Sequence, residues 1–345
     1  MYGKKILRTV FAMVIALVYF ATTFVSASAM TTSHSRTIRE EEKISEPGLK
    51  KNIVLDDGSV VSGASLKAGD TVNFLLESNV PENLIDYLPS GSDSSEGYDL
   101  VIYDRMDAEL IFQPESLCIK VNSHELSENE YRYELQHMED YSLIRIELDL
   151  VELFIEHNYF DYEDFGRAPI TIGYQATLTE EAVSGAYHNA AWLEYENKVT
   201  PEQVAVVSTY GIEIHKITND AVPTALAGAE FEIYRMIDGN IEVLFENLVT
   251  DIEGIIRVDG LAAGVYYIRE TKAPEGFVMD PEAFEIVLDE NLVDQLAIVT
   301  VTNARITPPV HTGDASSYVI GCTFILVGIV ACMCMMLKRR SKSEG

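Results

Sequence analysis

The sequence predicts an all-β protein with two β-sandwich domains in tandem, preceded by a signal peptide and followed by a transmembrane helix. Three observations lead to this prediction. Short segments with alternating apolar and polar residues recur from Leu49 to Arg305, separated by residues typical of turns. Each end of the chain instead carries a long apolar run. No helical repeat, coiled coil or low-complexity tract interrupts the alternating segments, which favours antiparallel sandwiches.

The N-terminal run is typical of a secretory signal peptide. Three basic residues within the first eight precede the apolar stretch VFAMVIALVYFATTFV, and SASAM follows it. A charged region, an apolar region and an A-x-A site in this order predict cleavage after Ala29. An uncleaved membrane anchor is the alternative. We therefore assign residues 1–29 to the signal peptide, and residues 30–47, which are polar and charged, to a leader without a core.

The C-terminal run predicts a transmembrane helix over residues 318–337. Its twenty residues carry no charge. Twenty apolar residues in a helix are about the length needed to span a bilayer. The basic tail, residues 338–345, follows at once and should stay in the cytoplasm by the positive-inside rule. The region between the two apolar runs is therefore predicted to lie outside the cell.

This exported region is strongly acidic. The whole chain has 55 acidic and 25 basic residues. The signal peptide accounts for three of the basic residues, and the tail for four basic and one acidic, which leaves 54 acidic against 18 basic residues, or −36. A surface of this sign repels nucleic acid and anionic lipid, so nucleic acid is excluded as a partner.

The side chains that usually cross-link or catalyse are sparse in the exported region. Cys118 is its only cysteine, so no disulfide can form within the chain there, and any internal cross-link needs another chemistry. The histidines are scattered without metal-ligand spacing. No Ser-His-Asp arrangement, phosphate loop or glycosidase-like carboxylate pair stands out. The sequence thus predicts no metal, no cofactor and no ordinary enzymatic activity.

Two blocks of alternating segments define the predicted domains. The first domain, residues 48–200, contains strand candidates at 72–76, 98–104, 143–150, 170–178 and 190–197. The second domain, residues 211–305, contains strand candidates at 211–217, 229–236, 254–261, 264–270, 283–288 and 297–305. Residues 201–210 are predicted to be a linker. Residues 151–160 are compatible with a helical insertion, which the pattern does not decide.

Three strands of the second domain extend an apolar face into a polar residue. Alternation continues the apolar face of the first strand to Lys216, that of the strand 264–270 to Glu270, and that of the last strand to Asn303. An unpaired buried Lys or Glu is costly, so their convergence needs a reason. One reason is a buried salt bridge with an amide beside it. The other is a chemical reaction among the three.

In an apolar pocket the lysine amine loses its proton more readily and the carboxyl gains one. A neutral amine held against the asparagine carbonyl can attack it. The protonated acid can polarise that carbonyl and shuttle protons while ammonia leaves. The product is an amide bond joining the first and last strands. On this hypothesis Glu270 should be buried, largely protonated and close to both Lys216 and Asn303.

The stretch YYIRETKAPEGF, residues 266–277, closely resembles the E-box strand and turn of collagen-adhesin B-type domains, also called SpaA-like or prealbumin-like domains. GAEFEIYR, residues 228–235, is similar to the second strand of that family. The resemblance covers nearly all of residues 211–304. It implies a prealbumin-like sandwich with an isopeptide bond between Lys216 and Asn303, formed with Glu270 as the catalytic acid.

The first domain resembles the fimbrial isopeptide-formation domain of Gram-positive backbone pilins, an immunoglobulin-like sandwich, through residues 67–84 and 170–197. Alternation also places an amine, a carboxylate and an amide on apolar faces here. The resemblance implies that Lys51 and Asn197 form a second isopeptide bond with Asp104 as the catalytic acid, and Lys50 is the alternative amine.

The stretch TPPVHTGD within the spacer 306–317, together with the apolar helix and the basic tail, resembles a sortase cell-wall sorting signal. In that family the transpeptidase cuts between Thr and Gly, which are Thr312 and Gly313 here. The common pentapeptide begins with Leu-Pro, whereas this one is PVHTG. A plain stop-transfer anchor is the alternative.

Together the resemblances imply a cell-wall-anchored pilin subunit or stalk protein, whose partners are a sortase and either peptidoglycan or other pilin subunits. Each isopeptide bond would form once within the chain itself, and no other enzymatic activity is expected. In backbone pilins, the lysine of a Tyr-Pro-Lys motif usually joins the next subunit, and this sequence has no such motif. Lys43 and Lys198 are the candidate exposed amines. The resemblance therefore does not distinguish a shaft subunit from an accessory or base subunit. The alternatives are an adhesin that binds a host ligand, with the aromatic-rich segment 154–165 as its nearest candidate, and a secreted hydrolase, which the lack of a catalytic constellation disfavours.

Overall fold

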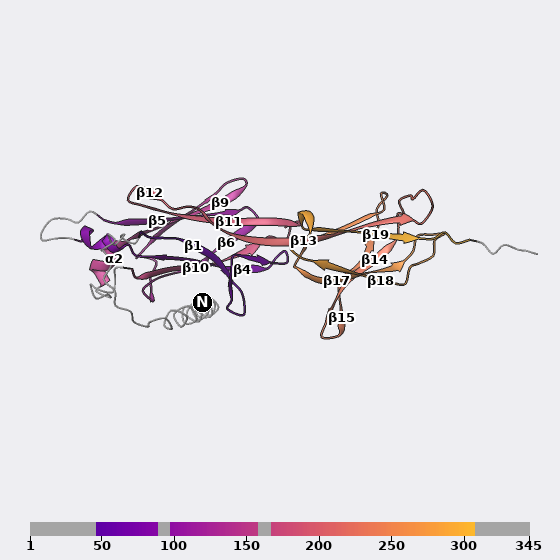
Figure 1. Ribbon diagram of the computed structural model, residues 1–345, viewed down its shortest axis with the longest axis horizontal. Helices are drawn as coiled ribbons and strands as arrows, with labels where there is room; N and C mark the ends of the chain where they lie inside the picture. Colours follow the sequence, from indigo (N-terminus) through magenta and orange to yellow (C-terminus); the bar gives the residue numbers. More distant parts are fainter. Residues whose placement is uncertain (1–45, 89–96, 158–166, 308–345) are drawn as a thin grey trace, which may run out of the picture. The chain divides into compact units, whose positions relative to one another are not determined.

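The computed structural model describes residues 46–88, 97–157 and 167–307 (Figure 1). The predicted signal peptide with Ala29, the sorting motif with Thr312 and Gly313, and the predicted membrane helix all lie outside these residues. Within the described part of the chain, no helix is both long and apolar enough to cross a membrane. Nearly all its regular structure is β, which confirms the predicted all-β class.

Two sheets face each other in the first sandwich. One sheet has the order β2-β1-β4-β10-β6-β7, built from β2 (Val60–Val61), β1 (Lys50–Val54), β4 (Thr71–Asn79), β10 (Pro169–Leu178), β6 (Leu110–Val121) and β7 (His124–Glu125). The other contains β13 (Gln203–Thr218), β11 (Gly185–Tyr195), β5 (Asp99–Asp107), β9 (Tyr141–Asp149) and β8 (Arg132–His137), with β3 (Gly63–Ser65) and β12 (Lys198–Val199) at its margins.

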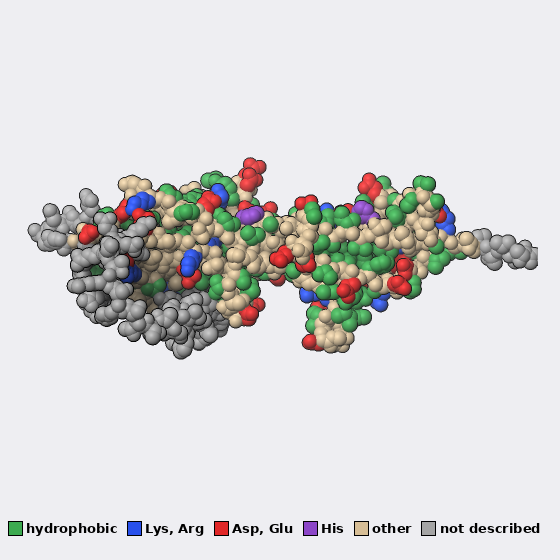
Figure 2. Space-filling model, in the orientation of Figure 1, with side chains coloured by type: hydrophobic (Ala, Val, Ile, Leu, Met, Phe, Trp, Pro, Cys, Tyr) green, Lys and Arg blue, Asp and Glu red, His purple; other side chains and the backbone are tan. Residues whose placement is uncertain are grey.

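The core of the first sandwich follows from the two-residue period of its strands. Along β9, every second side chain is buried, as expected for a strand with one face on the core and one on solvent. The β4 and β10 strands lie inside the opposite sheet and contribute Phe74 and Tyr174, two of the largest fully buried side chains. On the outside, acidic side chains are scattered over the face shown in Figure 2, in keeping with the charge of the chain.

A short helix, α2 (Leu150–His157), follows β9 directly, so the ambiguous segment 151–160 is helical as far as His157. The Oδ1 atom of Asp149 accepts the backbone N–H groups of Val151 and Glu152, both at 3.0 Å, and so caps the first turn of the helix. The rest of that segment, with most of the aromatic stretch 154–165, lies outside the described residues. A 3-10 helix, η1 (Glu82–Tyr87), lies between β4 and β5.

The prediction of a linker at residues 201–210 is wrong, because β13 runs through it. The first half of β13 pairs with β11 and, in parallel, with β3, and it buries Ala205 and Val207 in the first core. The second half pairs with strands of the second sandwich. Alternation in this stretch changes parity once: Ala205 and Val207 are buried before Gly211, and Ile212 and Ile214 after it, where the pairing with β16 shifts register. The strand nevertheless continues through this point, so a single 16-residue strand serves both domains.

The second sandwich has its own core and two sheets. The second half of β13 lies between β16 (Ile255–Leu261) and β19 (Leu296–Asn303). The facing sheet has the order β15-β14-β17-β18, built from β15 (Asn240–Val249), β14 (Glu230–Ile237), β17 (Gly264–Lys272) and β18 (Ala283–Leu288). A 3-10 turn, η2 (Val293–Gln295), precedes β19. The β13 and β19 strands, the first and last of this domain, are parallel neighbours.

The turn after β17 and the segment after β19 form a small unit of their own. The backbone N–H of Val278 donates to the carbonyl of Ala304 at 2.9 Å, and that of Ile306 donates to the carbonyl of Gly276 at 2.8 Å. The Arg305 guanidinium lies over the ring of Phe277, 5.2 Å from its centroid. The PEG turn is thus closed by a two-stranded bridge.

The assignment of residues 203–210 to a strand can be tested with proline. The backbone N–H of Val206 donates to the carbonyl of Ser62 at 3.0 Å, so Val206→Pro removes a hydrogen bond inside the sheet. We expect this substitution to lower the free energy of unfolding by about 3 kcal/mol in a urea titration. The control is Glu202→Pro, one residue before the strand, which should have little effect. Equal unfolding midpoints for the two variants would contradict the assignment.

Candidate functional site

The second domain brings Lys216, Glu270 and Asn303 together between its two sheets. Lys216 lies on β13 and Asn303 ends the neighbouring strand β19, where the parallel register places Lys216 beside Val301. Glu270 comes from β17 in the facing sheet. The three side chains are almost inaccessible to solvent, with exposures of 0%, 2% and 1% for the lysine, glutamate and asparagine.

The amine of Lys216, the carboxyl of Glu270 and the amide of Asn303 contact one another directly. Nζ of Lys216 is in direct contact with Oδ1 of Asn303 and lies 3.2 Å from Oε1 of Glu270. The same Oε1 accepts a hydrogen bond from Nδ2 of Asn303 at 2.8 Å. The other oxygen, Oε2, accepts the backbone N–H of Asp280 at 2.9 Å, which holds the carboxyl group in place. The amine, carboxyl and amide are thus in mutual contact.

Burial makes the Lys216 amine easier to deprotonate. Loss of hydration lowers the pKa of Lys216, and the nearby charge and hydrogen bond of Glu270 oppose that shift only in part. The ring of Phe231, whose centroid lies 5.5 Å from Nζ, forms part of the apolar wall. A larger fraction of the amine is therefore neutral than at the surface, and the neutral amine is the nucleophilic form.

The first domain places Lys51 on β1 opposite Asp104 on β5, with Nζ 2.6 Å from Oδ2. Tyr174 of β10 lies beside both and contacts each of them. Its hydroxyl donates to Oδ2 of Asp104 at 2.5 Å and accepts from Nζ of Lys51 at 2.8 Å. It also accepts from Nδ2 of Asn189, on β11, at 2.7 Å. All four side chains are buried, so an amine, a carboxyl, an amide and a hydroxyl share one buried site.

Burial also governs the electrostatics here. It lowers the pKa of Lys51, against the opposing effect of Asp104, and it raises the pKa of Tyr174 well above its usual range. Oδ1 of Asp104 and Oδ1 of Asn189 are buried and accept no hydrogen bond from any described residue. An unpaired buried oxygen costs about 1–3 kcal/mol, so the site maintains a costly arrangement of polar groups.

The prediction of Asn197 as the amide of this site is wrong. Asn197 is exposed in the turn between β11 and β12, with a φ of 62°. The antiparallel register sets Ala191 opposite Asp104, so Asn189 is the neighbour on the same face, whereas Asn197 lies six residues away in the other direction, roughly 20 Å along an extended strand. The alternative amine, Lys50, is exposed on the outer face of β1.

Asn189 and Tyr174 were not singled out from the sequence, because the register between strands is not visible there. Asn189 shares the buried face of Ala191 and Leu193, and the same alternation that led to Asn197 also leads back to it. Tyr174 follows Ile172 on the buried face of β10. A buried tyrosine hydroxyl usually has a hydrogen-bond partner, which is the signal that could have drawn attention to it.

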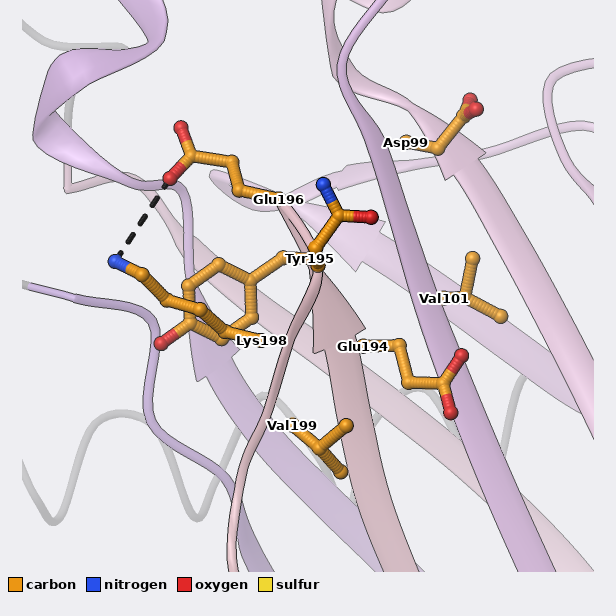
Figure 3. A pocket seen from close by; sticks show the side chains of 8 residues that line it. Asp99, Val101, Glu194, Tyr195, Glu196, Lys198 and Val199 are labelled. Atoms are coloured by element: carbon orange, nitrogen blue, oxygen red, sulfur yellow. Dashed lines mark ion pairs between the residues drawn. The ribbon is translucent and has the colours of Figure 1, made fainter.

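Asn197 lines a separate surface pocket of about 380 Å³ beside the β11–β12 turn (Figure 3). Figure 3 shows Glu196 and Lys198 reaching toward each other at its margin, with Nζ and Oε2 3.9 Å apart. The Lys198 amine also donates to Glu46 at 3.0 Å, and this hydrogen bond raises the pKa of Lys198. Of the two predicted exposed amines, Lys198 is therefore held by carboxylates, and Lys43 lies outside the described residues.

Among the described residues, no group of three histidine, cysteine, aspartate or glutamate side chains is placed to hold a metal ion. Cys118 is buried on β6. The two clusters built around buried lysines are therefore the candidate functional sites.

Comparison with known proteins yields one family match and several structural ones. Residues 211–304 match the family model of SpaA, described as a prealbumin-like fold domain. No curated protein matches the sequence significantly. The fold resembles the major pilin SpaA of Corynebacterium diphtheriae, with 14% identity over 76% of this chain and 70% of that one and a TM-score of 0.54.

Two further solved structures are similar. The pilus 2b backbone protein of group B streptococcus is 22% identical over 74% of this chain and 97% of its own, with a TM-score of 0.51. The pilus backbone RrgB of Streptococcus pneumoniae is 15% identical over 76% of this chain and 100% of its own, also with a TM-score of 0.51. The second sandwich thus matches the SpaA prealbumin-like family, and about three quarters of the chain has the fold of Gram-positive pilus backbone proteins.

Proposed function

We propose that this chain is a structural subunit of a Gram-positive pilus, displayed on the cell surface, and that each of its sandwiches is closed by a self-formed Lys–Asn isopeptide bond. The observation that carries the proposal is the contact among Lys216, Glu270 and Asn303 in a buried site. The family match over residues 211–304 and the likeness in fold to three pilus backbone proteins support it.

In the second domain, the reaction begins when Lys216 passes a proton to Glu270, whose Oε1 is 3.2 Å from Nζ. The neutral amine attacks Cγ of Asn303, and a C–N bond forms as the carbonyl becomes a tetrahedral oxyanion. Glu270 supplies the proton it holds to Nδ2, to which it is hydrogen-bonded, and then accepts the second proton lost by the attacking nitrogen. The bond between Cγ and Nδ2 breaks, ammonia leaves and the carbonyl re-forms as a secondary amide.

The resulting bond suits a protein that bears tension. It joins the first and last strands of the domain, which are parallel neighbours, so a force applied at both ends passes through a covalent link as well as the hydrogen bonds between strands. The residues joined are 87 positions apart. Closing a loop of this length stabilises the folded state by about 4–5 kcal/mol if loop entropy acts as it does for disulfides.

The first domain supports the same chemistry with different residues. Lys51 supplies the amine, Asp104 the acid and Asn189 the amide, in place of the exposed Asn197. Here the new bond would connect the two sheets, because Lys51 lies in one sheet and Asn189 in the other. Each site reacts once with its own chain, so we propose no catalytic turnover on other substrates.

The C-terminal sequence suggests how the chain is attached to the cell surface. We propose that a sortase cleaves between Thr312 and Gly313 and joins the chain to peptidoglycan or to another subunit; the support for this is the sequence pattern alone. The choice among shaft, accessory and base subunits depends on an acceptor amine, and Lys198, which is already paired with Glu46 and Glu196, is not favoured for that role.

The intact mass of the purified fragment 30–312 tests the two bonds. We expect a mass lower than that of the linear chain by two molecules of ammonia, because each bond releases one. Glu270→Ala should restore one of them, since the amine loses its proton acceptor, and should lower the free energy of unfolding by about 4–5 kcal/mol. Glu253→Ala, a change at an exposed turn, serves as the control. An unmodified mass for the folded fragment would refute the proposal.

The choice of Asn189 has a matched test within the same strand and turn. Asn189→Ala should restore one ammonia to the mass, because Nδ2 of this residue is hydrogen-bonded within the Lys51 cluster. Asn197→Ala should leave the mass loss unchanged apart from the substitution, because Asn197 is exposed. If Asn197→Ala restored the ammonia and Asn189→Ala did not, the assignment of the amide would be reversed.

A further inference from the structure

We propose that Tyr174 is a catalytic residue of the first domain, a proton relay that carries a proton from Asp104 to the leaving nitrogen of Asn189. The inference rests on the proposed isopeptide chemistry and adds to it a fourth reacting side chain that the second domain does not use.

The hydroxyl of Tyr174 touches all three of the other groups. It donates to Oδ2 of Asp104 at 2.5 Å, and it accepts from Nζ of Lys51 at 2.8 Å and from Nδ2 of Asn189 at 2.7 Å. A phenol has one hydrogen to donate and two lone pairs, so this arrangement uses its full capacity. The nitrogen that must leave as ammonia and the carboxyl that holds the proton are thus joined through a single oxygen atom.

The second domain is arranged differently, which gives a comparison within one molecule. There the carboxyl group of Glu270 itself accepts the hydrogen bond from Nδ2 of Asn303, at 2.8 Å, so the acid reaches the leaving nitrogen directly. In the first domain, the described contact of Nδ2 of Asn189 is with the tyrosine hydroxyl. Aspartate is one methylene shorter than glutamate, and the hydroxyl spans the remaining gap.

The hydrogen bonds of Lys51 leave the lone pair of its neutral amine available. A neutral amine has two hydrogens and one lone pair, and its two hydrogen bonds to Asp104 and Tyr174 employ the hydrogens. The lone pair therefore stays available for attack. The rings of Phe74 and Tyr174, with centroids 5.1 and 5.4 Å from Nζ, exclude water from the amine.

Each proton in the proposed reaction has a donor and an acceptor among these side chains. Lys51 gives one proton to Asp104, and its neutral nitrogen forms a bond to Cγ of Asn189, whose carbonyl electrons move to oxygen. Once Asp104 is protonated and Nδ2 has gained a lone pair in the tetrahedral intermediate, the Tyr174 hydroxyl turns its hydrogen from Asp104 to Nδ2. It passes that proton to Nδ2 and takes one from Asp104, which then accepts the second proton lost by the attacking nitrogen. The bond between Cγ and Nδ2 breaks with its electron pair on nitrogen. The products are a secondary amide, free ammonia, neutral Tyr174 and protonated Asp104.

Burial keeps the phenol in the form that this role requires. Because desolvation and the charge of Asp104 both raise the pKa of Tyr174, the hydroxyl stays protonated and transfers a proton only while it receives another. The rings of Phe74 and Phe112 pack against that of Tyr174, with centroids 5.5 and 5.4 Å away, and fix the position of the hydroxyl.

The test is Tyr174→Phe in the full chain, which keeps the ring and removes only the hydroxyl. The chain is made by cell-free synthesis and quenched at intervals, and mass spectrometry of its peptides follows the loss of ammonia at each site. We expect the Lys51–Asn189 bond to form about 100-fold more slowly, the order of magnitude for loss of a general acid–base group. The Lys216–Asn303 bond in the same molecule should form at the unaltered rate and so reports that the chain has folded.

Tyr266→Phe is the matched control. Tyr266 is buried in the second core, and its hydroxyl donates to the carbonyl of Ala262 at 2.8 Å, so its described hydrogen bond does not involve the reacting groups of either site. We expect this variant to leave the rates of both bonds unchanged. A slowing of the first bond by this change would show that the rate responds to core packing alone and would overturn the relay.

A second variant keeps the hydroxyl and changes only its acidity. With 3-fluorotyrosine at position 174, the packing is preserved, but the rate of the first bond and its pH profile should shift, because proton transfer through the hydroxyl depends on its acidity. The titratable groups that contact this hydroxyl are Lys51 and Asp104, and both are retained. A rate and pH profile equal to those of the unmodified chain would overturn the relay, as that result means a purely structural role.

The outcomes separate this inference from the function on which it rests. If the unmodified chain loses no ammonia at Lys51 and Asn189, the proposed bond in the first domain is wrong, and the relay falls with it. If the unmodified chain reacts and Tyr174→Phe reacts at the same rate, the relay alone is overturned and the bond stands.

Discussion

A lysine amine buried between two β-sheets is the constraint on which the rest of this structure depends. A charged amine without solvent is costly unless it is paired and hydrogen-bonded, so strands far apart in the sequence must bring a carboxyl and an amide to the same place. In the second domain, Lys216 stays buried because β17 supplies Glu270 and β19 supplies Asn303. The pairing of the first strand with the last is thus both the closure of the fold and the assembly of the site.

The two domains meet this constraint in different ways. In the second, the amine and the amide share one sheet and the acid comes from the other. In the first, the acid and the amide share a sheet, and Lys51 reaches them from the opposite side together with Tyr174. The requirement is therefore chemical rather than topological: an amine, an acid and an amide must meet without water, and any strand that faces the core can supply them.

The sequence alone predicted the all-β class and the residues of the second site, because both depend on the alternation within single strands, as for Lys216, Glu270 and Asn303. It failed where the answer lay in the pairing between strands. Asn189 and Asn197 have the same parity on one segment, and only the register of β11 against β5 separates them. The predicted linker likewise proved to be part of β13. Ala205 and Val207 face the first core and Ile212 the second, and only the pairing of each half with its neighbouring strands decides this.

The most direct measurement is tandem mass spectrometry of a protease digest, which identifies the residues joined rather than the mass lost. The proposed reactions predict a branched peptide in which Nζ of Lys216 is bonded to Cγ of Asn303, and a second that joins Lys51 to Asn189. Recovery of the four segments as separate, unmodified linear peptides from the folded protein would contradict it.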